Sequence, residues 1–310
     1  MIDQFQLGDA VEHRGIVVAP LFPRRDPVAS YITLDEALPR GLTITEIDDA
    51  GAVPELVVQN PLDEHVLLYD GEELVGAKQN RILNVSVLLE ARSARKIPVS
   101  CVEQGRWSRV SDRFASGRHV SHAHLRRLKA ETQAARPLAR GVAQGVVWDE
   151  LHERMVAMSV DSPTGASRDL YRSRERELAA LEDAFPAFPG QCGAFLGLGE
   201  SMCLDLVSRP DAFARLWPKI RAGYLLDALE HLDGKQTPFA VVPTFLSLVD
   251  TADHARQPSV GLGEDVRVRG ERVIGSGLAL DGEFVQLSAF SSEDGGQHAF
   301  GRIARPSARR

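Results

Sequence analysis

The sequence predicts an α+β protein, with an antiparallel β-sandwich or barrel-like body and a helical middle region, on the basis of three observations. Residues 10–104 contain many short β-branched runs separated by Gly, Pro, Asp and Asn, as in strands with short connections. Residues 120–159 change to Arg, Ala, Leu and Gln at helical spacing, and the C-terminal part returns to strand-like segments. We therefore expect one large domain over 1–310, β-rich over 1–110, mainly helical over 111–187 and α/β over 188–310.

The N-terminal region supplies most of the expected strands. In GLTITEI the alternation of side chains places Ile44 and Glu46 on the same face of a strand. The segment SYITLDEALPRG interrupts this pattern with a short helix, capped by Thr33 or Asp35 and ended by Gly41. The segments that we expect to be strands are GIVVAPLF, GLTITEI, PELVVQN, HVLLYD, RILNVSVLL and KIPVSCVE.

The middle region predicts helices separated by breakers. The run HAHLRRLKAETQAARPLARGVAQGVVWDELHERM should split into two helices at Pro137 and Gly141. After the turn-rich SPTGAS, the segment SRDLYRSRERELAALEDAF is expected to form one amphipathic helix with Leu170, Leu178 and Leu181 on its apolar face. The basic residues of the first helix favour a solvated face over contact with nucleic acid.

The C-terminal region predicts a strand pair, a helix and two hairpins. QCGAFLGLGESMCLDLV is expected to form two strands around a Gly-Glu-Ser turn, followed by a helix from Pro210 to about Leu232. The turns of the two hairpins are RGER and LDGE, and the Asp-Gly turn is the stronger signal.

Composition excludes several classes of protein. Hydrophobic residues make up 44% of the 310 residues and charged residues 25%, which is ordinary for a globular chain. A formal charge of -7 and a pI near 5.8 argue against nucleic acid as a partner. The chain shows no secretory signal and no apolar run long enough to span a membrane, so a cytoplasmic location is expected. Cys101, Cys192 and Cys203 are too scattered for a disulfide framework and are expected to be reduced and buried.

Polar residues concentrate in YDGEELVGAKQNR, residues 69–81. After an Asp-Gly turn, Glu72 and Glu73 lie on opposite faces if the chain is extended, and so do Gln79 and Asn80. One member of each pair should therefore point inward. Arg81 adds a rigid guanidinium fork suited to a carboxylate or a phosphate.

A second polar segment, VSCVEQGRWS, covers residues 99–108. Glu103 comes where an apolar strand leaves the core, and Gly105 permits a bend. Arg106 and Trp107 together can hold an anionic group and stack on a planar ring. The alternative is structural: an ion pair between Arg106 and Glu103, with Trp107 filling the core.

These segments carry a resemblance to a known family. YITLDEAL, LTITEI, LYDGEELVGAKQNRILNVSVLL and IPVSCVEQGRW, followed by QCGAFLGLGESMCLDLV and DAFARLWPKIRAGYLLDAL, resemble the family of unknown function named for its association with ADP-ribosylglycohydrolase and rhodanese-phosphatase-superfamily proteins. The resemblance covers most of the chain. Gln286 stands where the resemblance would place a histidine, which argues against a histidine-dependent mechanism. The positions that match the family's polar signature are Glu46, Glu72, Gln79, Asn80, Arg81, Glu103, Arg106, Trp107 and Gln191.

The resemblance implies a ligand derived from NAD or ADP-ribose. If the site is catalytic, Glu72 or Glu103 could activate water while Arg81 and Arg106 hold a phosphate, in hydrolysis of a glycosidic or phosphoester bond. The acids with an amide could alternatively coordinate Mg²⁺, and no spacing selects either; no cofactor is assigned. Two other hypotheses use the same residues: a non-catalytic sensor or interaction module in a stress or conflict system, and a scaffold whose polar residues connect strands.

Two further residue sets carry weaker signals. His119, His122 and His124 could bind zinc. On a helix, however, only the pair three residues apart, His119 and His122, would share a face, and no Cys partner follows, so a solvated helix start is favoured over a metal site. Cys101 could be a nucleophile, but its apolar flanks favour a buried small residue.

Overall fold

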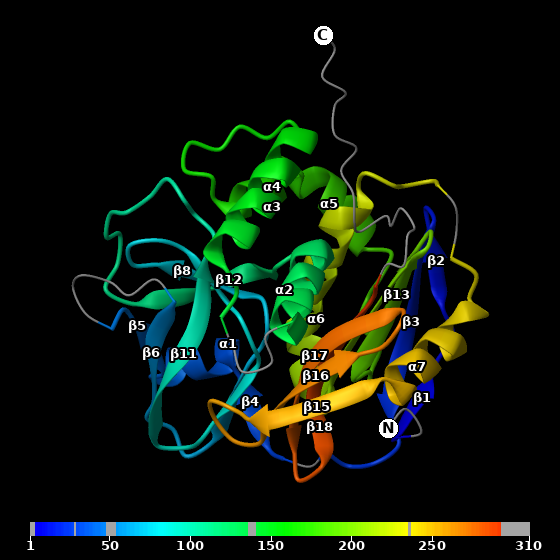
Figure 1. The fold of residues 1–310 in the computed structure, drawn as a ribbon, viewed down its shortest axis with the longest axis horizontal. Coiled ribbons are helices and arrows are strands. Elements are labelled where there is room, and N and C mark those ends of the chain that lie inside the picture. Colours follow the sequence, from blue (N-terminus) through cyan, green and yellow to red (C-terminus); the bar gives the residue numbers. More distant parts are fainter. Residues whose placement is uncertain (1–3, 28, 48–53, 136–140, 235–236, 293–310) are drawn as a thin grey trace.

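The computed structural model describes residues 4–27, 29–47, 54–135, 141–234 and 237–292. These residues form helices together with three predominantly antiparallel β-sheets, one of nine, one of six and one of three strands (Figure 1). The expected α+β class with a β-rich body is confirmed. None of the helices in the described ranges is long and apolar enough to cross a membrane.

The nine-stranded sheet joins the two ends of the chain. N-terminal strand β3 pairs with β13, and the last strand, β18, lies between β14 and β17. The β13–β14 pair and the hairpin turn at Asp281 and Gly282, both with positive φ, confirm the strands and turns expected there. The strands are β1 (Phe5–Leu7), β2 (Val11–His13), β3 (Ile16–Pro23), β13 (Gly193–Leu198), β14 (Ser201–Val207), β15 (Asp253–Pro258), β16 (Glu264–Arg269), β17 (Val273–Leu280) and β18 (Glu283–Ser291).

The six-stranded sheet is built from residues 43–120 and curls into a half-barrel. Its order is β12-β8-β9-β11-β6-β5, and the two edge strands β12 and β5 contact each other, so the sheet bends round on itself. β12 is a strand at the start of the region expected to be mainly helical. The strands are β5 (Thr43–Thr45), β6 (Glu55–Asn60), β8 (Glu72–Gly76), β9 (Arg81–Leu83), β11 (Ser93–Cys101) and β12 (Phe114–Val120).

The third sheet, of three strands, packs against the inside of the half-barrel. It contains β4 (Tyr31–Thr33), β7 (His65–Leu68) and β10 (Val87–Leu89), and the pair β4–β7 is parallel. The expected short helix follows as α1 (Leu34–Ala37) and a 3₁₀ turn, η2 (Leu38–Arg40). Thr33 N and Oγ1 both donate to Glu36 Oε2 at 2.9 Å, and Gly41 ends the segment at φ 110°. The core between these elements includes Leu42, Ile44, Leu56, Val66, Leu74, Leu83 and Val99.

The helices of the middle region pack together beside the sheets (Figure 1). They are α2 (Ala123–Ala135), α3 (Gln144–Ala157), α4 (Ser167–Ser173) and α5 (Glu175–Glu182). The break between α2 and α3 was expected, although Pro137 itself lies outside the described residues. The single helix expected over residues 167–185 divides instead at Arg174, whose φ of -117° interrupts helical geometry. Leu170, Leu178 and Leu181 are buried, as their spacing predicted.

Two expectations about α2 are wrong. Arg126 and Lys129 are each only 1% exposed, because Arg126 binds a buried aspartate and Lys129 binds Asp70 at 2.6 Å. The helix therefore places cations in the interior rather than on a solvated face. His122 and His124 are also buried, and the Nε2 atom of each lies beside a carboxylate oxygen of Glu150, at 2.8 and 3.1 Å.

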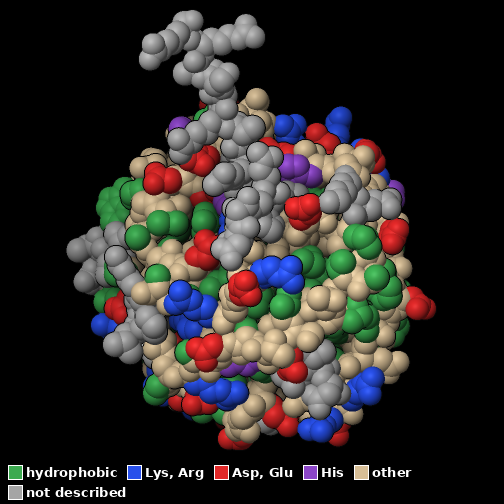
Figure 2. All heavy atoms as spheres, turned by 45° about the vertical axis from the view of Figure 1, so that its right-hand side comes forward, with side chains coloured by type: hydrophobic (Ala, Val, Ile, Leu, Met, Phe, Trp, Pro, Cys, Tyr) green, Lys and Arg blue, Asp and Glu red, His purple; other side chains and the backbone are tan. Residues whose placement is uncertain are grey.

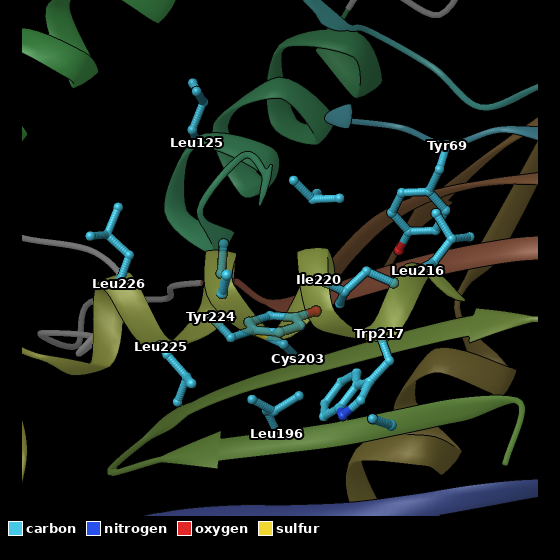
Figure 3. Packing of buried hydrophobic residues seen from close by; sticks show 14 of the residues in the cluster. Tyr69, Leu125, Leu196, Cys203, Leu216, Trp217, Ile220, Tyr224, Leu225 and Leu226 are labelled. Carbon is cyan, nitrogen blue, oxygen red and sulfur yellow. The ribbon is translucent and has the colours of Figure 1, made fainter. Parts of the chain in front are cut away.

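Helix α6 (Pro210–Ala228) forms the centre of the molecule. Figure 3 shows it between strands β13 and β14 on one side and α2 on the other, with Trp217 directed toward the strands. Trp217 Nε1 donates to the carbonyl oxygen of Phe185 at 3.0 Å. The expected helix from Pro210 to about Leu232 is thus confirmed, ending a turn earlier.

The last helix, α7 (Val241–Thr251), flanks the nine-stranded sheet (Figure 1) and was not expected from the sequence. Its apolar side buries Val242, Phe245 and Leu246 in a separate core against that sheet. On the face shown in Figure 2, acidic, basic and apolar side chains are interspersed.

Candidate functional site

The inner face of the half-barrel becomes polar at one end. Leu83 and Val99 are buried in its apolar core, and the next inward positions along the same strands are Arg81 and Cys101, which are paired across β9 and β11. Glu46 follows Ile44 by the same two-residue period. The polar end therefore arises where the alternation of each strand continues but its apolar residues stop.

Arg81 is fully buried and only partly hydrogen-bonded. Its Nη1 donates to Gln79 Oε1 at 3.1 Å, and its Nη2 lies 3.9 Å from Glu46 Oε1. Within the described residues, Nε and Nη2 of Arg81 and both carboxylate oxygens of Glu46 have no hydrogen-bond partner. A buried polar group without a partner costs about 1–3 kcal/mol. Arg81 and Glu46 thus keep buried donors and acceptors that lack partners among the described residues.

The amide of Gln79 connects the two polar segments of the sequence. Its Oε1 accepts from the thiol of Cys101 at 3.0 Å and its Nε2 donates to the carbonyl oxygen of Glu103 at 3.0 Å. Burial raises the pKa of the Cys101 thiol. Cys101 is therefore a buried protonated thiol at neutral pH, which supports its expected role as a small core residue.

Glu103 is held as a carboxylate. Oε2 lies 2.6 Å from Arg106 Nη2 and accepts from the backbone N of Asn80, while Oε1 accepts from Thr164 Oγ1 at 3.1 Å. Burial alone would raise the pKa of Glu103, but the hydrogen bonds, that of Arg106 first, lower it below its ordinary value. Glu103 also forms a β-bridge with Ala166, just before α4.

Arg106 and Trp107 behave differently from each other. Arg106 forms the ion pair with Glu103 that the structural alternative expected. It also donates to Asn80 Oδ1 at 3.0 Å and to the carbonyl oxygen of Ala77 at 2.9 Å. Trp107 does not fill the core, because half of its surface is exposed. Its ring lies 5.4 Å from Lys78 Nζ and 5.9 Å from the guanidinium carbon of Arg81.

Glu73 is a buried carboxyl with a raised pKa. Burial raises the pKa of Glu73 to about 7, with the nearby negative charges of Glu103 and Asp169 acting in the same direction and Arg168 opposing them. Its Oε1 has no hydrogen-bond partner among the described residues. A Cβ added to Gly117 would lie 2.7 Å from Glu73 Cβ and Oε2, so Glu73 packs directly on the backbone of β12.

Glu72 belongs to a different cluster. Its Oε1 lies 2.8 Å from Lys219 Nζ of α6, and its Oε2 accepts from the backbone N of Tyr69. Lys219 also binds Asp35 and Ser116 Oγ at 2.7 Å. The structure therefore joins seven of the sequence-predicted site residues through contacts at the half-barrel end and places Glu72 in a separate ion-pair cluster. The seven are Glu46, Gln79, Asn80, Arg81, Glu103, Arg106 and Trp107.

His119 is a half-buried imidazole on β12. Its ring stacks on Tyr171 with centroids 3.9 Å apart. Burial, with the positive charges of Arg118, Arg168 and Lys219, lowers the pKa of His119 to about 4. Burial raises the pKa of Tyr171 well above its ordinary value, and the negative charges of Asp227 and Glu73 act in the same direction. Sequence reasoning did not identify Arg168 as a neighbour of Glu73, because helix α4 comes from a distant part of the chain.

Gln191 of the signature and Gln286, which stands in place of the expected histidine, both have structural partners. Gln191 accepts from the backbone N of Phe188 at 2.9 Å and donates to the carbonyl oxygen of Gly193, which fixes the approach to β13. Gln286 donates to Ser288 Oγ at 2.5 Å in the nine-stranded sheet. Both lie on elements other than those that form the half-barrel end.

Metal-ligating groups do not gather in the part of the chain that the structure describes: no set of three or more His, Cys, Asp or Glu side chains there could hold a metal ion. A magnesium site made of acids and an amide needs fewer such side chains and stays a prediction. The described side chains of the half-barrel end supply carboxyl, guanidinium, amide and aromatic groups.

Comparison with known proteins identifies the family but adds no described relative. The family model of the ARG and Rhodanese-Phosphatase-superfamily-associated Protein domain, ARPP-1, matches residues 4–290. No curated protein and no solved structure matches the chain significantly. The match includes all the strands and helices described above, with only the final residue of β18 beyond it. The chain therefore belongs to the ARPP-1 family.

Proposed function

We propose that the protein hydrolyses a small molecule derived from NAD or ADP-ribose, with the half-barrel end as its active site. The observation that carries the proposal is the pair formed by Glu73 and Glu103. Their surroundings move their pKa values in opposite directions, to about 7 for Glu73 and below the ordinary value for Glu103. Two interacting carboxyls with separated pKa values are the usual arrangement for acid and base roles.

In this proposal Glu73 transfers the proton. A carboxyl with a pKa near 7 can donate a proton to a leaving group and accept one from water at neutral pH. Glu103 stays ionised beside Arg106 and stabilises positive charge that develops on a ribosyl group. Glu72 is not given this role, because Lys219 holds its carboxylate at 2.8 Å.

The substrate class follows from the groups that remain free. The unused donors of Arg81 suit a phosphate or carboxylate, and the exposed ring of Trp107 beside Lys78 suits a planar base. Glu46 offers acceptors to hydroxyl groups. The family name, which links these proteins to ADP-ribosylglycohydrolase, supports a ligand that combines a base, a ribose and a phosphate.

Turnover of NAD and ADP-ribose by the purified chain, followed by chromatography of the products, tests the proposal. Glu73→Gln should lower kcat by a factor on the order of 10²–10⁴ without lowering the melting temperature. Glu72→Gln should lower the melting temperature and leave kcat within a few-fold. The reverse result would assign the acid to Glu72, and absence of turnover with both substrates would remove the hydrolase proposal for this class.

A second candidate function is a non-catalytic sensor of the same ligands. This function is favoured by the hydrogen bonds of Glu103. Both of its carboxylate oxygens already accept from Arg106, Asn80 and Thr164, so they are engaged within the protein rather than directed at a substrate. In that case NAD or ADP-ribose should raise the melting temperature with no products formed. Trp107→Ala should remove the shift, whereas Phe239→Ala, which removes an exposed aromatic ring just before α7, should leave it unchanged.

A further inference from the structure

A cavity of about 570 Å³ lies among the helices of the middle region, apart from the site residues described above. Its walls come from the end of α3, from α5, from the residues after α6 and from the turn between β2 and β3. The volume falls within the range of small-molecule pockets. None of the residues that line the cavity belongs to the half-barrel end.

The apolar part of the wall combines small alanine side chains with larger methionine and leucine side chains. Met158 provides an adaptable thioether surface. Ala157 and Ala180 are exposed, which keeps the entrance wide. The apolar lining residues are Ala157, Met158, Ala180, Leu229 and Leu232.

Of the three arginines that line the cavity, Arg176 alone has no partner among the described residues. Arg14 is bound to Asp233, with Nη2 and Oδ2 2.5 Å apart. Arg174 donates to the carbonyl oxygen of Met158 at 2.5 Å and lies 3.4 Å from Glu177. Arg176 lines the same cavity and has neither an ion-pair partner nor a hydrogen-bond partner within the described residues. The remaining acid, Glu230, is paired with Arg154 at 3.4 Å.

We propose that this cavity binds an amphipathic organic anion, with a single negative head group on Arg176 and an apolar or aromatic body against Met158, Leu229 and Leu232. One uncompensated guanidinium matches one negative charge. A ligand with several phosphates would bring more negative charge than the wall can neutralise. The apolar lining supplies the surface that holds the rest of the molecule.

The probe for this site is 8-anilinonaphthalene-1-sulfonate, which has one sulfonate and an aromatic body. Fluorescence titration of the full chain should show one binding site per chain. Ala180→Trp should fill the cavity and weaken binding at least tenfold. Ala179→Trp is the matched control, because Ala179 is the adjacent exposed residue of α5 and does not line the cavity, so its affinity should stay within twofold of the unmodified chain.

Two further variants make the test independent of a single substitution. Ala157→Trp fills the cavity from α3 and should also weaken binding at least tenfold, and Arg176→Ala should weaken it at least fivefold while Arg176→Lys retains most of the affinity. Circular dichroism and thermal melting would show that each variant is folded. Equal affinity of Ala180→Trp, Ala157→Trp and Ala179→Trp for the probe would overturn the proposal.

Discussion

The molecule contains two buried polar clusters that differ in how completely their groups are paired. At its centre Asp205 accepts hydrogen bonds from Tyr69, Tyr224, Ser288 and Arg126.

The charges of this central cluster are closely matched. Arg126 lies 2.7 Å from Asp205 and 2.6 Å from Ser288 Oγ, and of its nitrogens Nε alone lacks a partner among the described residues. Burial raises the pKa of Tyr69 and of Tyr224, so both hydroxyls stay protonated as donors.

The half-barrel end is the opposite case. Arg81, Glu46, Glu73 and Asn80 are buried or nearly so, yet each has at least one polar atom without a partner in the described residues. A satisfied network specifies a fold, whereas an unsatisfied one stores free energy that a ligand can recover. The difference is consistent with a structural role for the central cluster and supports the proposal that the half-barrel end binds a ligand.

The largest expected effect is in the central cluster. Asp205→Asn should lower the free energy of unfolding by about 3–5 kcal/mol, because it leaves Arg126 charged in the interior. Urea denaturation measures the change. Asp211→Asn breaks an exposed pair with Arg209 and should cost less than about 1 kcal/mol. Similar losses in the two variants would mean that pairing in the centre contributes no more than a surface ion pair.

Glu73 should make stability depend on pH. Its folded-state pKa of about 7 lies above the ordinary 4.5, so its contribution is complete below pH 4.5 and is lost as the pH rises to 7. Glu73→Gln should therefore gain stability relative to the unmodified chain between pH 4.5 and 8, by on the order of 3 kcal/mol. Urea denaturation at pH 4.5 and at pH 8 measures the free energy of unfolding of both proteins, with Glu12→Gln, at an exposed position, as the control. A pH-independent difference would contradict the raised pKa.

His119 should act in the opposite direction over a similar range. Its folded-state pKa of about 4 lies below the ordinary 6.5, so its contribution is present above pH 6.5 and is lost as the pH falls to 4. His119→Phe keeps an aromatic ring on Tyr171 but cannot be protonated. The variant should therefore lose about 2 kcal/mol less free energy of unfolding between pH 6.5 and pH 4 than the unmodified chain, a value reduced because the ring is partly exposed. The exposed His152→Phe serves as control. If the free energy of unfolding of both variants changes with pH as it does in the unmodified chain, the lowered pKa of His119 is contradicted.

The smallest expected effect concerns Arg81 and Glu46, the weakly paired ions of the half-barrel end. Replacing both, as Arg81→Met with Glu46→Gln, should change the free energy of unfolding by less than about 1 kcal/mol, because little pairing is lost and two desolvated charges are removed. The same variant should lose binding of NAD and ADP-ribose in a thermal-shift assay. A loss of stability as large as that of Asp205→Asn would show that Arg81 is structural.

Much of the fold was predictable because its signals are local. The period-two alternation of GLTITEI, the Asp-Gly turn before Glu283 and the capping of α1 each depend on neighbouring residues. β12 was missed because FASGRHV contains a glycine and alternates polar residues irregularly. The division of α4 from α5 was missed because nothing in the sequence around Arg174 marks a break.

The candidate site was predictable in its membership but not in its pairing. Two short polar segments identified most of the residues, since strand ends from β9 and β11 are neighbours in the sheet. Sequence could not tell that Lys219, 147 residues from Glu72, would bind that carboxylate. Nor could it tell that Arg168 would approach Glu73, because both contacts depend on how helices pack on the finished sheet.

The position of β18 has a consequence for biosynthesis. All six strands of the half-barrel lie within residues 43–120 and can pair early during translation, whereas β14 and β17 must wait for the strand that separates them. That strand also carries Ser288, a partner of Asp205. A nascent chain interrupted before residue 283 would expose two unpaired strand edges, so we expect the pairing of β18 to remove an aggregation hazard late in folding.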